Sequence, residues 1–124
     1  MSVRNQVRTA IKILSLTTGA MLAKEVRAAM ATFNDPEVQN QPAFPTADGR
    51  WLTVAEVKEH FGPDWATDRT VIEQCINAYA GRLARAAIEQ VGLDVRVLSP
   101  DQMAQLLTAT TKAEELAFVR MTAN

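Results

Sequence analysis

The chain has 124 residues, of which 48% are hydrophobic and 22% are charged, and its formal net charge at pH 7 is −1. This length is typical of one domain that buries its own core, and the composition excludes an intrinsically disordered chain. The small net charge excludes a global electrostatic attraction to nucleic acid or to an anionic membrane.

Residues 1–33 should form a helix, because apolar side chains recur there at three- and four-residue steps. A continuous helix from Val3 to Phe33 would extend about 46 Å, which is long for so small a domain. We therefore expect a kink near Gly19, next to Thr17 and Thr18. The apolar stretch 13–23 is shorter than the roughly 20 residues of a membrane span and favours a core helix over a secretory signal.

Residues 34–50 should form a loop, either packed or extended as an arm. Asn34, Asp35 and Pro36 end the first helix, and further prolines follow. Phe44 in this loop is expected to anchor it to the domain, with partner binding as the alternative.

The central segment 51–92 predicts two helices. Thr53 followed by Glu56 forms a capping box, and Gly62 before Pro63 ends the short helix that it starts. A longer helix should begin between Thr67 and Thr70 and stop at Gly92.

The last part of the chain predicts an extended segment and a final helix. Apolar and charged residues alternate over residues 93–98. Ser99, Pro100 and Gln102 then form a strong helix start for residues 99–124. Residues 116–121 are apolar on more than one side, which favours burial against another surface. The expected fold is all-α or nearly so: one domain, 1–124, with four to five helices, a long proline-containing loop and one short extended segment.

Charge is distributed unevenly along the chain. Residues 1–33 carry an excess of basic side chains, and residues 34–76 carry an excess of acidic ones. We expect these charges to pair within the chain or to be solvated, with a head-to-tail contact between copies as the alternative.

No catalytic constellation is recognisable. His60 and Cys75 could form a nucleophile pair, but their spacing favours a helix-end imidazole and a buried thiol. We expect a protein that is not an enzyme, with no metal and no cofactor. A lone cysteine also excludes an internal disulfide and favours a reducing compartment, so we expect a cytoplasmic protein of a bacterium or host cell.

A helix-turn-helix over residues 52–79 is a lesser alternative. Lys58 stands where that motif needs a small buried residue, and the second helix opens with Asp68. An acidic helix would enter a phosphate-lined groove poorly, so we do not expect nucleic acid as a partner.

Side chains that could contact a partner come from four parts of the chain. They are the basic row of the first helix, one loop phenylalanine, two tryptophans and the apolar end: Arg4, Arg8, Lys12, Phe44, Trp51, Trp65, Leu116, Phe118, Val119 and Met121.

A further pattern in the central part of the chain consists of residues 51–62 (WLTVAEVKEHFG), Asp68, Val71, Ile72, Glu73, Ile76, Ala80, Gly81 and Arg82. Through these residues the segment 51–86 resembles the opening helices of tailed-phage head-tail connector (adaptor) proteins. In that family this segment tends to open the protein, whereas here residues 1–50 precede it, and the section 93–124 has no match in it. The resemblance implies a non-enzymatic virion or prophage protein assembled as a ring, and no individual functional residue carries over.

The sequence therefore predicts a protein that works through protein–protein contact. A phage or prophage connector-type adaptor, located in the cytoplasm or in the virion, is the first hypothesis. A small regulatory or inhibitor protein that docks on a larger bacterial or phage complex is the second. We expect a homo-oligomer or a protein partner, and no membrane.

Overall fold

The computed structural model describes residues 2–16 and 19–123, with the backbone alone at residues 16, 19 and 20. The mostly helical fold expected from the sequence is confirmed, with five α-helices and a two-stranded sheet in these ranges. The elements are α1 (Val3–Leu16), α2 (Gly19–Thr32), β1 (Pro42–Pro45), β2 (Trp51–Thr53), α3 (Val54–Phe61), α4 (Arg69–Gln90) and α5 (Pro100–Thr122). Short 3-10 helices cover Pro36–Val38, Gly62–Thr67 and Val95–Val97.

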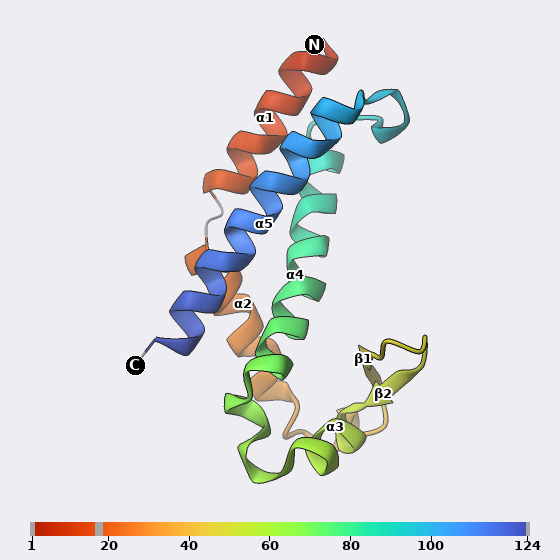
Figure 1. The fold of residues 1–124 in the computed structure, drawn as a ribbon, viewed down its shortest axis with the longest axis vertical. Coiled ribbons are helices and arrows are strands. Elements are labelled where there is room, and N and C mark those ends of the chain that lie inside the picture. The colour runs from red at the N-terminus through yellow and green to blue at the C-terminus, as the bar shows by residue number, and fades with distance from the viewer. Residues whose placement is uncertain (1, 17–18, 124) are drawn as a thin grey trace.

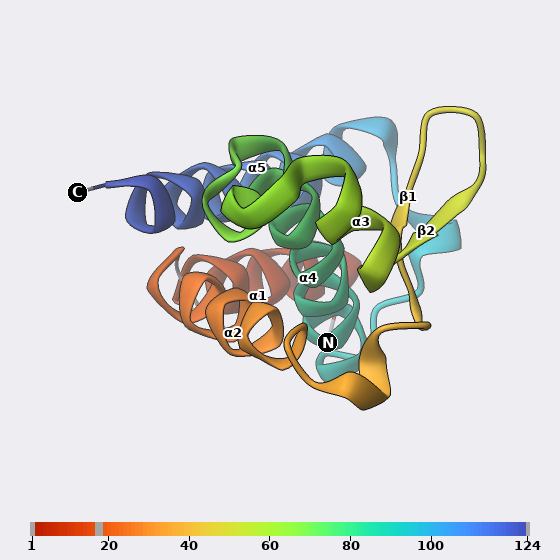
Figure 2. The same cartoon turned by 90° about the horizontal axis from the view of Figure 1, so that it is seen from below.

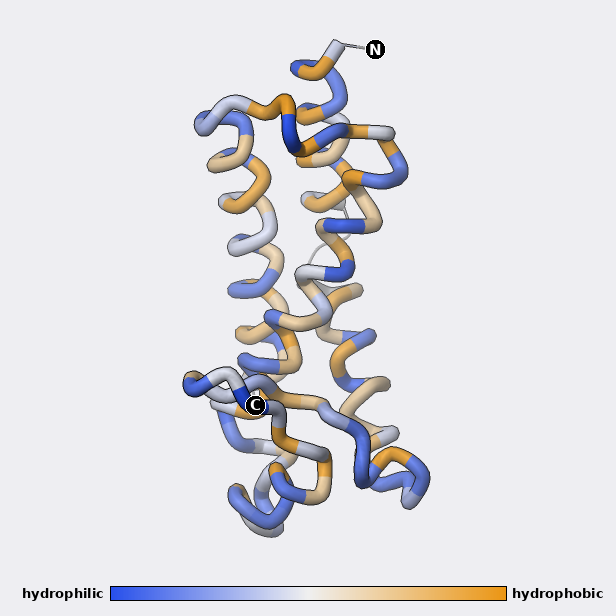
Figure 3. The backbone as a smooth tube through the Cα atoms, turned by 90° about the vertical axis from the view of Figure 1, so that its right-hand side faces the viewer, coloured by the Kyte–Doolittle hydropathy of each residue, from blue (hydrophilic) through white to orange (hydrophobic). Residues whose placement is uncertain are grey.

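The long helices form an elongated bundle in which α5 lies against α1, α2 and α4 (Figure 1). Seen from below, α5 runs alongside α1 and α2, and the hairpin of β1 and β2 projects away from them (Figure 2). Apolar and polar residues alternate along the helices (Figure 3), as expected where each helix buries one face.

Buried side chains form two clusters along the bundle. The lower core joins α2, α4 and α5 to β1, α3 and the Gly62–Thr67 turn, and its larger members are Leu22, Met30, Phe44, Trp65, Ile72 and Ile76. The upper core joins α1 to α4 and α5, and its buried members are Val7, Ala10, Leu14, Ala87, Leu93 and Leu106. The two ends of the molecule therefore depend on separate sets of contacts.

The predicted interruption of the first helix falls at Thr17 and Thr18, which lie outside the described residues. On either side of them, α1 ends at Leu16 and α2 begins at Gly19. Helix α2 ends at Thr32, close to the predicted stop at residues 34–36. Asp35 then accepts a hydrogen bond from the Glu37 N–H and starts a 3-10 turn.

The prediction that residues 34–50 form a loop is wrong in part, because Pro42–Pro45 is a strand. It pairs antiparallel with Trp51–Thr53, with Phe44 opposite Leu52. Thr46 and Arg50 close the turn through an N–H to carbonyl bond of 2.7 Å, and Gly49 adopts a positive φ of 86° within it. Pro42 and Pro45 favoured the prediction of a loop, because proline is rare within strands and occurs in sheets mainly at edges and strand ends.

The prediction of an extended segment at residues 93–98 is also wrong, because Val95–Val97 is a 3-10 helix. Asp94 caps it by accepting from the Arg96 N–H at 3.0 Å, and the Arg96 guanidinium pairs with the same carboxylate at 3.0 Å. Leu93 is buried while Val95 and Val97 are exposed. These local bonds replace a strand that would have lacked a partner.

The predicted helix starts and stops are confirmed by their hydrogen bonds. Both capping boxes are complete, from Thr53 to Glu56 and from Ser99 to Gln102. At the end of α4, the Gly92 N–H donates to the Glu89 carbonyl and Gly92 has a φ of 67°. The helix register is therefore set locally in these places.

Candidate interaction surfaces

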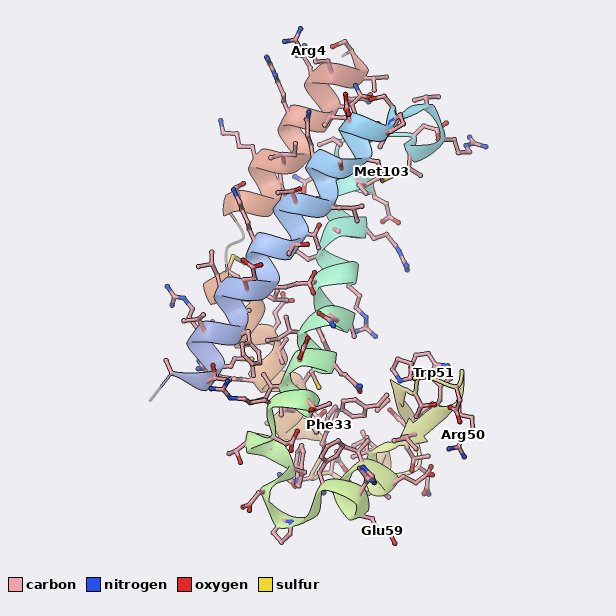
Figure 4. The ribbon with its side chains drawn as sticks, viewed as in Figure 1. Arg4, Phe33, Arg50, Trp51, Glu59 and Met103 are labelled. Carbon is pink, nitrogen blue, oxygen red and sulfur yellow. The ribbon has the colours of Figure 1, made fainter. Side chains whose placement is uncertain are left out.

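A basic row lies along α1 and consists of Arg4, Arg8 and Lys12. A spacing of four residues places all three on one side of the helix, and they are exposed while Val7 and Leu14 are buried. Arg4 and Arg8 border a shallow depression beside Gln102 and Gln105 of α5. Figure 4 shows Arg4 at the upper end of the bundle.

This basic row makes no ion pair with any acidic side chain that the structure describes. The ion pairs there join Arg50 to Asp48 and Arg96 to Asp94, each within a single turn. The predicted pairing between the basic N-terminal segment and the acidic middle is therefore not found in the described ranges. The alternatives of solvated charge and contact between copies stay open.

An acidic groove of about 280 Å³ lies between α4 and α5. Its polar rim and apolar floor consist of Glu73, Ile76, Asn77, Thr111, Glu114, Glu115 and Phe118. Partial burial, together with repulsion from Glu115 and Glu73, raises the pKa of the Glu114 carboxyl. The groove therefore favours a cationic occupant, which would relieve the repulsion.

Sequence reasoning missed this groove. Glu114 and Glu115 are adjacent in the chain, but Glu73 lies on another helix, so no local pattern joins the three. A cation of the same chain lies beside the groove, because the guanidinium carbon of Arg69 is 5.7 Å from the centre of the Phe118 ring.

Exposed apolar side chains are spaced along α5. Met103 and Leu107 lie on the stripe that continues to Glu114 and Phe118 of the acidic groove, because helical residues four, seven or eight apart share a side. Leu107 is 60% exposed. We call Met103, Leu107 and the groove residues that α5 contributes the α4-side face of α5.

The apolar end of α5 divides into an outer and an inner side. Leu116 and Val119 are exposed, at 52% and 62%. Ala117 is fully buried, and Phe118 and Met121 pack against the lower core. The burial expected for residues 116–121 is therefore found on the inner side, where α5 lies against α2, and cover of the outer side by another surface stays a prediction.

Besides Phe118, three aromatic side chains are predicted as possible contacts, and their environments differ. Phe44 is buried and packs edge-on against Phe33, with ring centres 5.8 Å apart, as expected of an anchor. Trp65 is buried beside Phe33, and the Lys58 ammonium lies 5.5 Å from its ring centre. Trp51 alone of the three is exposed, at 59%, on the projecting hairpin (Figure 4).

His60 and Cys75 are not brought together among the described contacts. His60 is exposed at the end of α3, edge-on to Phe61. Burial in the lower core raises the pKa of the Cys75 thiol to about 12. A thiol with that pKa is protonated at neutral pH and is a poor nucleophile. In the part of the chain that is described, no group of three or more His, Cys, Asp or Glu side chains could hold a metal ion.

The segment considered as a helix-turn-helix contains α3, the Gly62–Thr67 turn and the start of α4. Asp68 caps α4 by accepting from the Thr70 N–H at 2.8 Å, and Val71 and Ile72 behind it are buried. Glu73 lines the acidic groove. The start of this helix therefore presents acidic side chains.

No family model, curated protein or solved structure matches this chain. The similarity to connector proteins over residues 51–86 stays a prediction. Of the helices within the described ranges, none combines the length and the apolar character needed to cross a bilayer.

Proposed function

We propose that this protein works through protein–protein contact, as an assembly protein whose principal contact surface is α5. The form favoured by the resemblance over residues 51–86 is a connector-type adaptor of a phage or prophage. Its partners are copies of itself, and it carries out no chemical reaction.

The observation that carries this proposal is the exposed apolar content of α5. Leu107, Leu116 and Val119 each leave more than half of their surface in water. Complete burial of a leucine or valine side chain is worth about 1.5–3 kcal/mol. Leu107 and Leu116 lie on opposite sides of α5, because nine residues correspond to about two and a half helical turns. A contact that covers either Leu107 or the pair Leu116 and Val119 therefore has a favourable hydrophobic contribution.

The test is the mass of the purified protein, measured by light scattering from low to high micromolar concentration. We expect the wild type to exceed the monomer mass and Leu107→Glu or Val119→Glu to return it toward the monomer, because a carboxylate would be buried in the contact. Both side chains are exposed, so neither change should affect folding.

Ala86→Glu is the matched control, since Ala86 is exposed on α4 and is not part of the α4-side face. Assembly that is equally weakened by this control would contradict a role for α5. A wild type that stays monomeric at high micromolar concentration would overturn self-assembly. A 1:1 complex of such a monomer with a larger protein would then favour the docking regulator.

A further inference from the structure

We propose that the basic row of α1 in one copy docks on the acidic groove between α4 and α5 of a second copy. This inference rests on the proposed function and assigns the two surfaces that meet. Arg4, Arg8 and Lys12 are the cations of the contact, and Glu73, Glu114 and Glu115 are the anions.

The two surfaces are complementary in sign. None of the six side chains forms an ion pair with another described residue. Partial burial raises the pKa of the Glu114 carboxyl, and repulsion from Glu115 and Glu73 in the same groove raises it further. Cations of a second copy would remove that repulsion, whereas the unfilled groove keeps it.

The surfaces also match in length and in apolar content. The step from Arg4 to Lys12 is about 12 Å along a helix, and the step from Thr111 to Phe118 along the groove is about 10 Å. Half-buried Ile11 lies beside the row, at the depression between α1 and α5. The groove offers Phe118 and Ile76 as its apolar floor. A helix edge with one apolar and three basic side chains therefore fits an apolar groove with an acidic rim.

The placement of the two surfaces in one copy leaves both free. Arg4 and Arg8 border α5 on its α1 side, next to Gln102 and Gln105. The groove borders α5 on its α4 side. Each copy therefore presents one row and one groove, and the contact is head-to-tail. Contacts of this kind give a ring where the rotation closes and an open chain where it does not.

Charge exchange between two variants tests the contact. Variant A carries Arg4→Glu and Arg8→Glu, which makes its row acidic. Variant B carries Glu73→Lys and Glu115→Lys, which makes its groove basic. All four side chains are exposed, and thermal unfolding of each variant checks that it is folded.

We expect each variant alone to associate about tenfold or more weakly than the wild type, because like charges then face each other. An equimolar mixture should regain assembly, since the acidic row of A meets the basic groove of B and the unchanged surfaces meet as well. Wild-type assembly should also weaken as salt shortens the screening length from about 10 Å at 0.1 M to about 3 Å at 1 M.

The controls carry the same change of net charge elsewhere. Arg82→Glu with Arg85→Glu matches variant A, and Glu59→Lys with Glu89→Lys matches variant B. All four of these side chains are exposed and lie outside the row and the groove. The controls should assemble as the wild type does.

Two results would overturn the inference, and they differ in what they say of the proposed function. If the wild type and both variants assemble equally, or if the mixture does not recover assembly that both variants have lost, the assigned surfaces are wrong and self-assembly stands. If the wild type is monomeric at high concentration and low salt, self-assembly and the assigned surfaces fail together.

Discussion

The lower and upper cores differ in the size and origin of their side chains. Aromatic and long aliphatic side chains from helices, hairpin and turn fill the lower core. Among the described residues, the upper core has no aromatic side chain, and it is built from α1, α4, α5 and Leu93. A core with less buried apolar surface contributes less to stability. The end that carries the basic row is therefore held by fewer contacts than the end that carries the hairpin.

Polar contacts between helices follow the same division. In the upper part, the Gln6 amide donates to the carbonyls of Val91 and Gly92, each at 3.2 Å, and links α1 to the end of α4. In the lower part, the Arg27 guanidinium donates to the Arg120 carbonyl at 2.8 Å and links α2 to α5. Gln6 and Arg27 thus each link one half of the N-terminal segment to a later part of the chain.

The largest effect is expected from Ile76→Ala in the lower core. Ile76 is 1% exposed and contacts the cluster that joins most elements. Its truncation leaves a cavity and should lower the free energy of unfolding by about 3–5 kcal/mol. Urea unfolding followed by circular dichroism measures the loss. A loss below that of Leu14→Ala would reverse the comparison between the two cores.

Leu14→Ala in the upper core should cost about 2–3 kcal/mol, because the smaller cluster can relax around the lost side chain. Hydrogen exchange gives a sharper readout than global unfolding. Amides of α1 should lose protection before those of α4 near Ile76. Equal loss of protection in both helices would show that the two cores unfold as one unit.

The two capping boxes provide a smaller, matched pair of changes. Thr53→Ala removes the bond that the Thr53 hydroxyl accepts from the Glu56 N–H, and Ser99→Ala removes its counterpart at Gln102. Each should cost about 1 kcal/mol. Exchange should rise in α3 for the first variant and in the first turn of α5 for the second. An unchanged unfolding midpoint for either would contradict a stabilising cap.

The smallest effect concerns Glu114, in the groove beside Ile76 and Phe118 of the lower core. Because the pKa of Glu114 is raised, the folded state binds more protons than the unfolded state at pH values above the ordinary pKa of 4.5. The free energy of unfolding therefore falls as the pH rises through that range. Glu114→Gln should therefore raise the thermal unfolding midpoint slightly at pH 7, and the gain should vanish at acidic pH.

Glu56→Gln is the control, because the pKa of Glu56 is shifted in the opposite direction to that of Glu114. Hydrogen bonds from the Thr53 N–H and hydroxyl lower the pKa of Glu56. The Glu56 carboxylate therefore stabilises the fold at pH values above its ordinary pKa of 4.5, and this stabilisation is lost as the pH falls through the lowered pKa. This variant should be less stable than the wild type at pH 7. A midpoint that falls in both variants would contradict the repulsion inferred in the groove.

The hairpin and the segment 93–98 explain where sequence reasoning about the fold failed. Prolines at 42 and 45 resemble loop residues, yet Phe44 between them is held by the lower core and by pairing with Leu52. Val95 and Val97 alternate like a strand, yet no described strand lies beside them and Asp94 stabilises a turn instead. The strand at Phe44 forms because distant residues contact it. Residues 95–97 do not form a strand because no described strand lies beside them.

The helix boundaries and the basic row could be derived from the sequence alone, because caps, stops and residue spacing act over one or two turns. Thr53, Ser99 and Gly92 are examples. The acidic groove and the exposure of Trp51, in contrast with the burial of Trp65, depended on the tertiary structure. Glu73 meets Glu114 because two helices pack side by side, and which face a tryptophan buries depends on neighbours far away in the chain. Long-range packing leaves no periodic signal in a single sequence.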